Sequence, residues 1–327
     1  MPESSPFPPK ETIKICFAHI AYQMDSTFEK RDAGVKFFQV RSPEELDARI
    51  SEADVLVISG LWENRLLDLA PKLRFIQSIG AGYNQFSLDE LKARGIRLAS
   101  ASGRNRNAVS EHVFALILAL TRQTYIDRDN QHKHFWRGMI TDLDQRQDEL
   151  PGKTLGIVGL GAIGSRVAKL GKAFDMRVIA TKRNPATAQG PVDEVYTPDH
   201  LDELLGESDF VVLTCPLTEE TRGLIDDRAL SQMKPSAYLV NVARGACVDE
   251  PSLLEALRSG EIAGAALDTF WDEPLPEDSP FWDLENVVVT PHTGGETRMY
   301  EANIIDILLE NLDRLWRGED GLINQVV

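Results

Sequence analysis

Short apolar runs recur along the chain and alternate with stretches whose apolar residues have helical spacing. The early runs are residues 13–18, 35–40, 55–58 and 75–78, and the late runs are residues 210–214, 238–242 and 287–289. This alternation is typical of parallel sheets wound by helices, because parallel neighbours need a long crossover connection. The pattern therefore predicts an α/β fold built from doubly wound parallel sheets.

Two helical patterns are long. Residues 108–132 begin with a half that is apolar on nearly every side, whereas residues 296–317 carry one apolar face that needs a surface to cover. Because 327 residues are many for one core, we expect two domains. If the last helix returns to the first lobe, one domain comprises residues 1–103 and 294–327, and the other comprises residues 104–293.

A glycine-rich turn follows the strand-like residues 154–158 and precedes a helical pattern at 163–174. Its first glycine permits a tight turn, its second lets a pyrophosphate approach the backbone, and its third lets the helix pack on the strand. The helix N-terminus then points at the phosphates. The alternative is a loop of purely structural purpose. The turn predicts a Rossmann dinucleotide-binding domain whose contacts include Gly159, Gly161, Ala162, Ile163 and Gly164.

Basic residues follow the next strand-like run, residues 176–181. An NAD enzyme normally has Asp or Glu here to accept hydrogen bonds from the ribose, whereas this chain has Thr181, Lys182 and Arg183. Lys and Arg can pair with a 2′-phosphate, which an acid would repel. We therefore predict NADP (NADPH) as the cofactor and NAD as a weaker alternative; a solvated basic loop is the other explanation.

The composition narrows the classes of partner. A formal net charge of −16 argues against binding to nucleic acid or to an anionic membrane, and it requires a site for anions to supply its own positive field. The longest apolar stretch, residues 113–120, is too short to span a bilayer. Residues 1–12 lack the cationic start and apolar core of a signal peptide, so we expect a flexible leader and a cytoplasmic protein.

The three cysteines, Cys16, Cys215 and Cys247, have no metal-ligand spacing and cannot all pair. This usage suits a reducing compartment. We therefore predict neither a metal site nor a redox role for these residues.

Arg244, Glu273 and His292 lie in distinctive settings after the glycine-rich turn. Reduction of a 2-oxo acid needs a proton donor near the carbonyl oxygen, and an imidazole can donate. A buried carboxylate would favour the imidazolium, and an arginine can grip the substrate carboxylate or carbonyl. Taken singly, the three could be a surface-loop arginine, a turn residue beside Pro274 and a core histidine. Together they predict a hydride-transfer site.

A second glycine-containing loop, Gly80-Ala81-Gly82, follows a strand-like run. Such a loop can expose successive N–H groups that bind a carboxylate, and a simple glycine turn is the alternative. Nearby aromatic residues such as Tyr83, and the distant Trp136, fit a pocket wall or an interface equally well.

Seven segments follow one another over residues 54–326: Gly80-Ala81-Gly82-Tyr83-Asn84, Ser110-Glu111-His112-Val113, residues 152–161, Pro216-Leu217-Thr218, Asn241-Val242-Ala243-Arg244-Gly245, Ala266-Leu267-Asp268 and Thr290-Pro291-His292. In their order and spacing the chain resembles the D-isomer-specific 2-hydroxyacid dehydrogenases, in particular the glyoxylate and hydroxypyruvate reductases. The resemblance implies a Rossmann nucleotide-binding domain inserted into a flavodoxin-like substrate domain. It also implies a homodimer.

The resemblance further implies roles for single residues. Arg244 matches the substrate-binding arginine, Glu273 the acid of the Glu-Pro pair after Asp268, and His292 the proton-transferring histidine. Asp268 itself matches the residue that binds the nicotinamide carboxamide. The remaining matches are the substrate-binding amides of Ala81 and Gly82 and the cofactor contacts Cys215 and Pro216.

Three positions depart from the family pattern, and the last of them leaves the pocket shape and the substrate open. Thr214-Cys215 stands where relatives often carry His, and Ala162 stands where some carry a phosphate-binding Arg. After His292 the chain reads Thr293-Gly294-Gly295 instead of the commoner pattern with alanine. The sequence thus predicts an NADPH-preferring reductase that converts a small 2-oxo acid into a D-2-hydroxy acid. Alternatives are an NAD-dependent biosynthetic dehydrogenase of a phosphorylated 2-hydroxy acid and a non-catalytic nucleotide-sensing protein.

Overall fold

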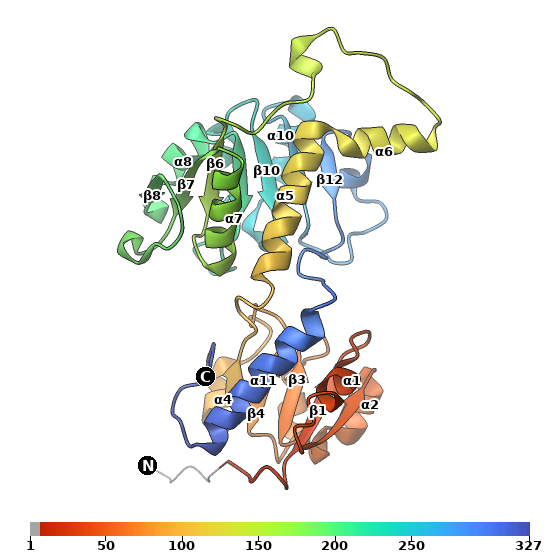
Figure 1. The fold of residues 1–327 in the computed structure, drawn as a ribbon, viewed down its shortest axis with the longest axis vertical. Helices are drawn as coiled ribbons and strands as arrows, with labels where there is room; N and C mark the ends of the chain where they lie inside the picture. The colour runs from red at the N-terminus through yellow and green to blue at the C-terminus, as the bar shows by residue number, and fades with distance from the viewer. Residues whose placement is uncertain (1–6) are drawn as a thin grey trace. The chain divides into compact units, whose positions relative to one another are not determined.

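The computed structural model describes residues 7–327, apart from the side chain of Asp144. These residues form two compact units (Figure 1). Unit 1 contains the chain up to Asn105 together with Thr297–Val327, and unit 2 is Arg106–Glu296. The bounds lie close to the junctions at 103/104 and 293/294 that the sequence predicts.

Unit 1 is built on a five-stranded sheet in the order β2-β1-β3-β4-β5, in which each strand pairs with its neighbours in parallel. The strands are β1 (Lys14–Ala18), β2 (Lys36–Val40), β3 (Val55–Ile58), β4 (Phe75–Ser78) and β5 (Arg97–Ala99). The accompanying helices are α1 (Met24–Glu29), α2 (Pro43–Arg49), the short η1 (Ile50–Glu52), α3 (Leu66–Leu69), α4 (Leu88–Ala93) and α11 (Tyr300–Trp316). This strand order confirms the flavodoxin-like prediction.

Both faces of this sheet are buried, because successive residues of its strands alternate between two apolar cores. Ile15 and Phe17 of β1 join the core that holds the apolar face of α11, whereas Cys16 and Ala18 join the other core. The predicted amphipathic last helix therefore covers the sheet of unit 1. That packing is why this unit includes both ends of the described chain.

Unit 2 is built on a seven-stranded parallel sheet in the order β12-β11-β10-β9-β6-β7-β8. Its strands are β6 (Thr154–Val158), β7 (Arg177–Thr181), β8 (Glu194–Tyr196), β9 (Phe210–Leu213), β10 (Tyr238–Asn241), β11 (Gly264–Leu267) and β12 (Val287–Val289). The order reverses between β6 and β9, and ligands bind at the carboxyl ends of strands at such a switch point. The predicted Rossmann architecture is confirmed.

Helices cover both faces of this sheet (Figure 1). The helices of unit 2 are α5 (Arg106–Arg122), α6 (Thr124–His132), α7 (Ala162–Ala173), α8 (Leu201–Glu207), α9 (Asp227–Ser231) and α10 (Glu250–Ser259), of which α6 contributes no buried residue to this packing. Short 3-10 turns occur at η2 (Leu143–Gln145), η3 (Pro185–Thr187), η4 (Pro198–His200), η5 (Gly245–Cys247) and η6 (Pro280–Asp283).

The prediction of one helix over residues 108–132 was wrong. The chain forms α5 and α6, which are separated by Gln123 in the left-handed region, with φ of 52°. The apolar face of α5 ends at Leu120 and Thr121, and α6 has no buried residue. Without apolar contacts to hold it in line with α5, the second half of the pattern leaves the sheet.

The expected flexible leader needs a partial correction. Residues 1–6 lie outside the described residues. From Phe7 onward the segment packs on α11: the Phe7 and Trp316 rings lie 6.5 Å apart, and Trp316 Nε1 donates to the Pro8 carbonyl at 3.1 Å. This part of the segment is therefore held in place.

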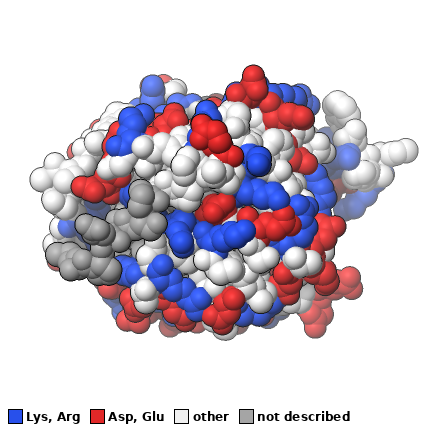
Figure 2. Space-filling view, turned by 90° about the horizontal axis from the view of Figure 1, so that it is seen from below, with Lys and Arg blue, Asp and Glu red and all other residues white. Residues whose placement is uncertain are grey.

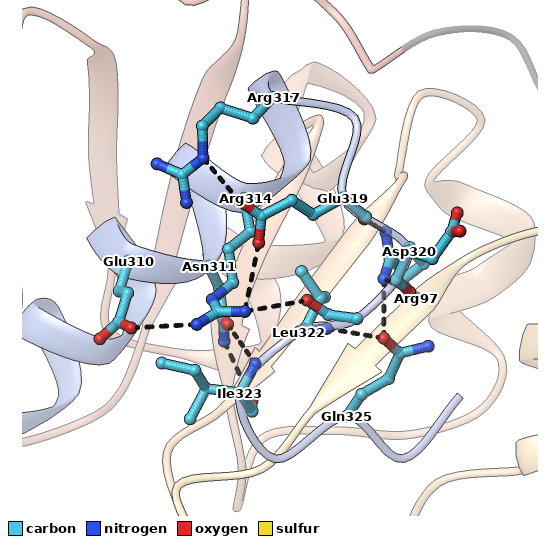
Figure 3. A network of polar contacts seen from close by, with 11 residues as sticks. Arg97, Glu310, Asn311, Arg314, Arg317, Glu319, Asp320, Leu322, Ile323 and Gln325 are labelled. Carbon is cyan, nitrogen blue, oxygen red and sulfur yellow. Dashed lines mark hydrogen bonds and ion pairs between the residues drawn. The ribbon is translucent and has the colours of Figure 1, made fainter.

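The C-terminal segment is fastened to the free edge of β5 (Figure 3). The Leu98 amide donates to the Val327 carbonyl at 3.2 Å, and the Val326 amide donates to the Leu98 carbonyl at 2.7 Å. The fully buried Asn311 accepts from the Ile323 amide at 2.8 Å and donates to Gln77 Oε1 at 3.0 Å. Arg97 donates to Gln325 Oε1 at 2.7 Å. Because these groups are satisfied inside the unit, the edge of the sheet is closed.

Acidic and basic side chains are interspersed on the face drawn in Figure 2. Among residues 7–327, no helix has both the length and the apolar character that a membrane crossing needs. In the same part of the chain, no three His, Cys, Asp or Glu side chains are grouped to hold a metal ion. Cys16, Cys215 and Cys247 are all free and buried.

Candidate active site

The glycine-rich turn lies at the carboxyl end of β6 and leads into α7. Gly159 has φ of 101°, and a Cβ atom there would lie 2.8 Å from the Cys215 backbone. At Gly164 a Cβ atom would lie 2.5 Å from the Gly159 carbonyl oxygen. Both positions therefore require glycine, one for conformation and contact and the other for close packing of helix on turn.

The N-terminus of α7 fits a phosphate-bearing cofactor. Its N-cap residue is Gly161, which has no side chain to cap the first turn, and no atom within 4 Å would obstruct a Cβ atom there. The first N–H groups of a helix, here at Ala162, Ile163 and Gly164, have no partner within the helix. The turn thus leaves both donors and open space for an anion, as a dinucleotide pyrophosphate requires.

A pocket of about 410 Å³ continues from this turn along the carboxyl ends of β6, β7 and β9. Most of the predicted cofactor contacts lie in its wall, namely Gly159, Gly161, Thr181, Lys182, Arg183, Cys215 and Pro216. Thr181 also fixes the turn, because its hydroxyl accepts from the Gly159 amide at 3.2 Å. Within unit 2 the structure therefore gathers these residues around one cavity.

The two basic residues of the pocket differ in their surroundings. Lys182 is half-buried, and its ammonium donates to the Leu160 carbonyl at 2.7 Å, inside the glycine-rich turn. Arg183 is exposed. An acid that the sequence analysis overlooked, Glu220, also lines the pocket. A hydrogen bond with the Thr218 side chain, then one with its own backbone and the nearby charge of Arg183, lower the pKa of Glu220.

His292 and Glu273 are directly paired. His292 follows β12, has φ of 53°, and lies with Nδ1 2.7 Å from Glu273 Oε2. The other carboxylate oxygen of Glu273 accepts from the Phe270 amide at 3.0 Å. No hydrogen bond within residues 7–327 engages Nε2 of His292, so that nitrogen is available to a ligand.

The exposure of the two side chains decides whether His292 is a core histidine and whether Glu273 is buried. The side chains of His292 and Glu273 are 44% and 37% exposed, respectively. His292 is therefore not a core histidine, and the expectation that its carboxylate partner is buried was wrong. Partial burial raises the pKa of Glu273, but hydrogen bonds from His292 and the Phe270 amide, with the charge of Arg244, outweigh this and bring the pKa below its usual value.

Arg244 follows β10 and is half-buried. Its Nη1 donates to the Ala243 carbonyl at 2.7 Å, and its own carbonyl accepts from Asn241 Nδ2 at 3.0 Å. A Cβ atom on the next residue, Gly245, would lie 1.9 Å from the Phe270 carbonyl carbon. The Arg244 loop therefore packs backbone to backbone against the segment whose amide holds Glu273.

Asp268, at the end of β11, anchors the loop that carries His292. The residue is 2% exposed, and its carboxylate accepts from the Thr290 hydroxyl at 2.6 Å and from the amides of Thr293 and Gly294 at 3.0 Å each. His112 of α5 lies 3.3 Å from the same carboxylate. Burial raises the pKa of Asp268, but the contacts with His112, Thr290 and Gly294 outweigh this effect and bring the pKa below its usual value. The carboxylate is therefore held ionised.

Asp268 therefore holds the chain in place on both sides of His292. Sequence reasoning did not predict this role. His112 and Thr290 also lie in segments that carry the family resemblance, yet nothing in their local pattern points to Asp268. The available signal was that each is a polar residue beside an apolar run. A remaining lone pair on Asp268 is compatible with the predicted contact to a carboxamide.

In unit 1, the loop after β4 exposes donors. The backbone N–H groups of Gly80, Ala81 and Gly82 donate to no acceptor in the described part of the chain. The Gly80 carbonyl, in contrast, accepts from the Ala101 amide at 2.9 Å. Three successive unpaired N–H groups are what an anion-binding loop requires, so this geometry fits the predicted carboxylate contact better than a simple glycine turn.

The comparisons with known proteins agree with this geometry. Residues 114–294 match the family model described as D-isomer specific 2-hydroxyacid dehydrogenase, NAD binding domain. A glyoxylate reductase of Pyrococcus furiosus is 36% identical over 292 residues, which cover 87% of this chain and 86% of the relative. The chain belongs to the D-isomer specific 2-hydroxyacid dehydrogenase family.

Two solved relatives bear on the cofactor. The NADPH-dependent glyoxylate/hydroxypyruvate reductase of Sinorhizobium meliloti, in complex with NADP and sulfate, has a TM-score of 0.79 and 26% identity, with 96% of this chain and 98% of that chain covered. The NAD-dependent formate dehydrogenase of Staphylococcus aureus, in complex with NAD, has a TM-score of 0.81 and 25% identity, with 96% and 99% covered. The fold therefore accepts either nucleotide.

Proposed function

We propose that this protein is an NAD(P)H-dependent reductase that converts a small 2-oxo acid, such as glyoxylate or hydroxypyruvate, into the D-2-hydroxy acid. The observation that carries the proposal is the His292–Glu273 pair with Nε2 free, in the unit that also holds the nucleotide pocket. The glyoxylate reductase relative supports the substrate class. Unit 2 is the proposed dinucleotide-binding domain, and unit 1 the proposed substrate-binding domain.

The proposed roles follow from the chemistry of the groups. A bound reduced nicotinamide supplies the hydride that the carbonyl carbon accepts. His292 donates a proton from Nε2 to the carbonyl oxygen, while Glu273 at Nδ1 orients the ring and stabilises its charged form. Arg244 binds the carboxylate or polarises the carbonyl, and the amides of Ala81 and Gly82 bind the carboxylate.

The proposal is tested by initial rates with glyoxylate, hydroxypyruvate and 3-phosphohydroxypyruvate, each with NADPH and NADH. We expect turnover of the unphosphorylated acids, and D-glycerate as the product from hydroxypyruvate. No turnover of any 2-oxo acid, with nucleotide binding retained, would indicate a sensing protein instead. A strong preference for the phosphorylated acid with NADH would support a biosynthetic dehydrogenase.

NADP preference belongs to this proposal. It is supported by Lys182 and Arg183 in the pocket wall and by the lack of an acid directly after β7. Glu220 is the observation that favours NAD, because its carboxylate lines the same pocket and would repel a 2′-phosphate. The cytoplasmic location stays a prediction.

We further propose a homodimer formed through an arm, which we define as residues 124–143. α6 and the segment after it project from the rest of unit 2 (Figure 1). Apolar side chains on the arm are open to solvent, with Trp136 96% and Met139 98% exposed. The arm also lines a hollow of about 810 Å³. Apolar exposure of this extent marks an interaction surface.

Trp136→Glu with Met139→Glu is therefore expected to convert the protein into a monomer, because two charges would have to be buried without partners. Sedimentation velocity measures the change. The matched control is Trp282→Glu, since Trp282 is exposed at η6 and is not among the residues that line the hollow. A wild-type protein that is already monomeric at micromolar concentration would exclude this assignment.

Glu273→Gln should shift the pH dependence of reduction. In the wild-type protein the pKa of the carboxylate lies below its usual value, so its negative charge beside the His292 ring is present at neutral pH and is lost only as the pH falls through that lowered pKa. Glu273→Gln carries no such charge at any pH, so its kcat should be lower at neutral pH and should not show the acid limb that protonation of Glu273 gives the parent. The measurement is kcat against pH; an equal kcat at neutral pH in the variant would leave Glu273 with a structural role only.

A further inference from the structure

Arg104 is the one partly buried arginine of residues 7–327 whose guanidinium has no hydrogen bond or ion pair. The other arginines without such a contact, Arg106, Arg122, Arg183, Arg222, Arg258 and Arg298, are exposed. Burying part of an arginine without a partner is costly, so the position implies a ligand that completes it. The neighbourhood indicates what that ligand is.

The backbone of Arg104 is fixed beside the Gly80-Ala81-Gly82 loop. Its amide donates to the Ala101 carbonyl at 3.1 Å, and the Ala101 amide donates to the Gly80 carbonyl at 2.9 Å. Arg104 and Ala81 also line one small cavity, with Tyr300 and Asn303 of α11 in its wall. The loops after β4 and β5 therefore place a free cation next to three free N–H groups.

α11 braces both loops. The Tyr300 hydroxyl donates to the Ile79 carbonyl at 3.0 Å, directly before Gly80. Asn303 Nδ2 donates to the Arg104 carbonyl at 3.2 Å. Since the backbone on each side is held and only the guanidinium is free, Arg104 is preorganised for a ligand.

A second unsatisfied group lies in the same cavity. The side-chain oxygen of Asn105 is buried and has no hydrogen-bond partner among the described residues. The oxygen and nitrogen of such an amide are assigned from their partners, so a flip would present the NH₂ group instead. After such a flip, the Asn105 NH₂ group and the Arg104 guanidinium would line the same cavity, and both would donate to an anionic ligand.

We propose that Arg104 binds the carboxylate of the substrate, together with the free N–H groups of Gly80, Ala81 and Gly82. The identity of the anion rests on the proposed function. A guanidinium can form two parallel hydrogen bonds to a carboxylate, whereas backbone amides supply dipoles without net charge. Arg104 thereby provides part of the positive field that a chain with net charge −16 must supply locally.

Because a carboxylate carries the same charge in substrate and transition state, Arg104 should contribute to uniform binding. Arg104→Gln is therefore expected to raise KM for glyoxylate by about ten- to a hundred-fold, with kcat and the Kd for NADPH nearly unchanged. Arg104→Lys, which keeps the charge but not the fork, should recover part of the loss. Arg258→Gln, the same charge change on α10, is the control.

Inhibition and binding by oxalate, an unreactive analogue, test Arg104 without turnover. We expect oxalate to bind Arg104→Gln at least about tenfold more weakly than the wild-type protein. If the wild-type protein turns over glyoxylate, and Arg104→Gln has the same KM and the same affinity for oxalate as the wild type, the inference is overturned and the proposed function stands. No wild-type turnover, with oxalate binding still dependent on Arg104, would overturn only the proposed function. A large loss of thermal stability in both Arg104 variants would show a structural role and overturn the inference.

Discussion

Replacing His292 with alanine is expected to lower kcat by about 10²- to 10⁴-fold while leaving the Kd for NADPH nearly unchanged. The physical reason is that Nε2 of His292 is free while Nδ1 is held by Glu273 at 2.7 Å, so the ring is oriented to transfer a proton at one atom. The nucleotide pocket is lined by other residues, from Val158 to Leu224, so its affinity should not depend on this ring. Steady-state rates with glyoxylate and fluorescence titration with NADPH give the two quantities.

The chain offers a matched control for this experiment. His200 also has a carboxylate partner, with Nδ1 3.0 Å from Glu203 Oε1, and its side chain is 54% exposed. It lies in η4, outside the residues that we place in the site. His200→Ala should therefore keep kcat within about twofold, because surface substitutions usually have small effects. Near-normal turnover in His292→Ala would falsify the proton-donor assignment.

Sequence reasoning placed the fully buried strands well. Val55–Ile58, Phe75–Ser78 and Thr154–Val158 are buried throughout and have the bounds that the sequence predicts, as does the partly exposed edge strand Val287–Val289. Such strands are short continuous apolar runs, so their ends coincide with the ends of the hydrophobic pattern. The glycine-rich turn was equally visible, because its geometry depends on residues that are adjacent in sequence.

Elements governed by distant contacts were not predictable in the same way. Gln123 breaks the long helix in a left-handed conformation that glutamine rarely adopts, so its local sequence gives no warning. The link from Asp268 to His112 joins segments far apart in the chain, and the exposure of Glu273 depends on how its loop packs. A motif can indicate the type of group, but the folded chain determines which groups it contacts.

The state of Arg104 illustrates the same limit. An arginine after an apolar run has no distinctive sequence pattern, and an exposed, paired side chain would be the ordinary expectation. Its partial burial without a partner depends on α11, which returns from the other end of the chain to hold the loops on both sides. Only the three-dimensional structure therefore distinguishes Arg104 from the exposed arginines.

Replacing Lys182 with aspartate is expected to reverse the cofactor preference from NADPH to NADH. A 2′-phosphate brings a charge of about −1.5 to −2, so the pocket must supply cations that outweigh the acidic protein and the nearby Glu220. The substitution removes a cation, adds repulsion and restores an acceptor for the ribose hydroxyls. In the structure the Lys182 ammonium donates to the Leu160 carbonyl, so it must exchange or share this contact when it pairs with phosphate.

Arg183→Ala tests the loss of a positive charge without the loss of a hydrogen bond to the glycine-rich turn, since the Arg183 side chain is exposed and makes no hydrogen bond in the described chain. A charge-assisted hydrogen bond contributes about 1.5–3 kcal/mol, and the exposure of Arg183 favours the low end, roughly a tenfold loss in kcat/KM for NADPH. Lys169→Asp, which makes the same charge change as Lys182→Asp on exposed α7 surface outside the pocket wall, should leave the NADPH/NADH ratio unchanged. Equal kcat/KM for the two cofactors in the wild-type protein, or an equal ratio in Lys182→Asp and Lys169→Asp, would mean that the basic pair does not contact a 2′-phosphate.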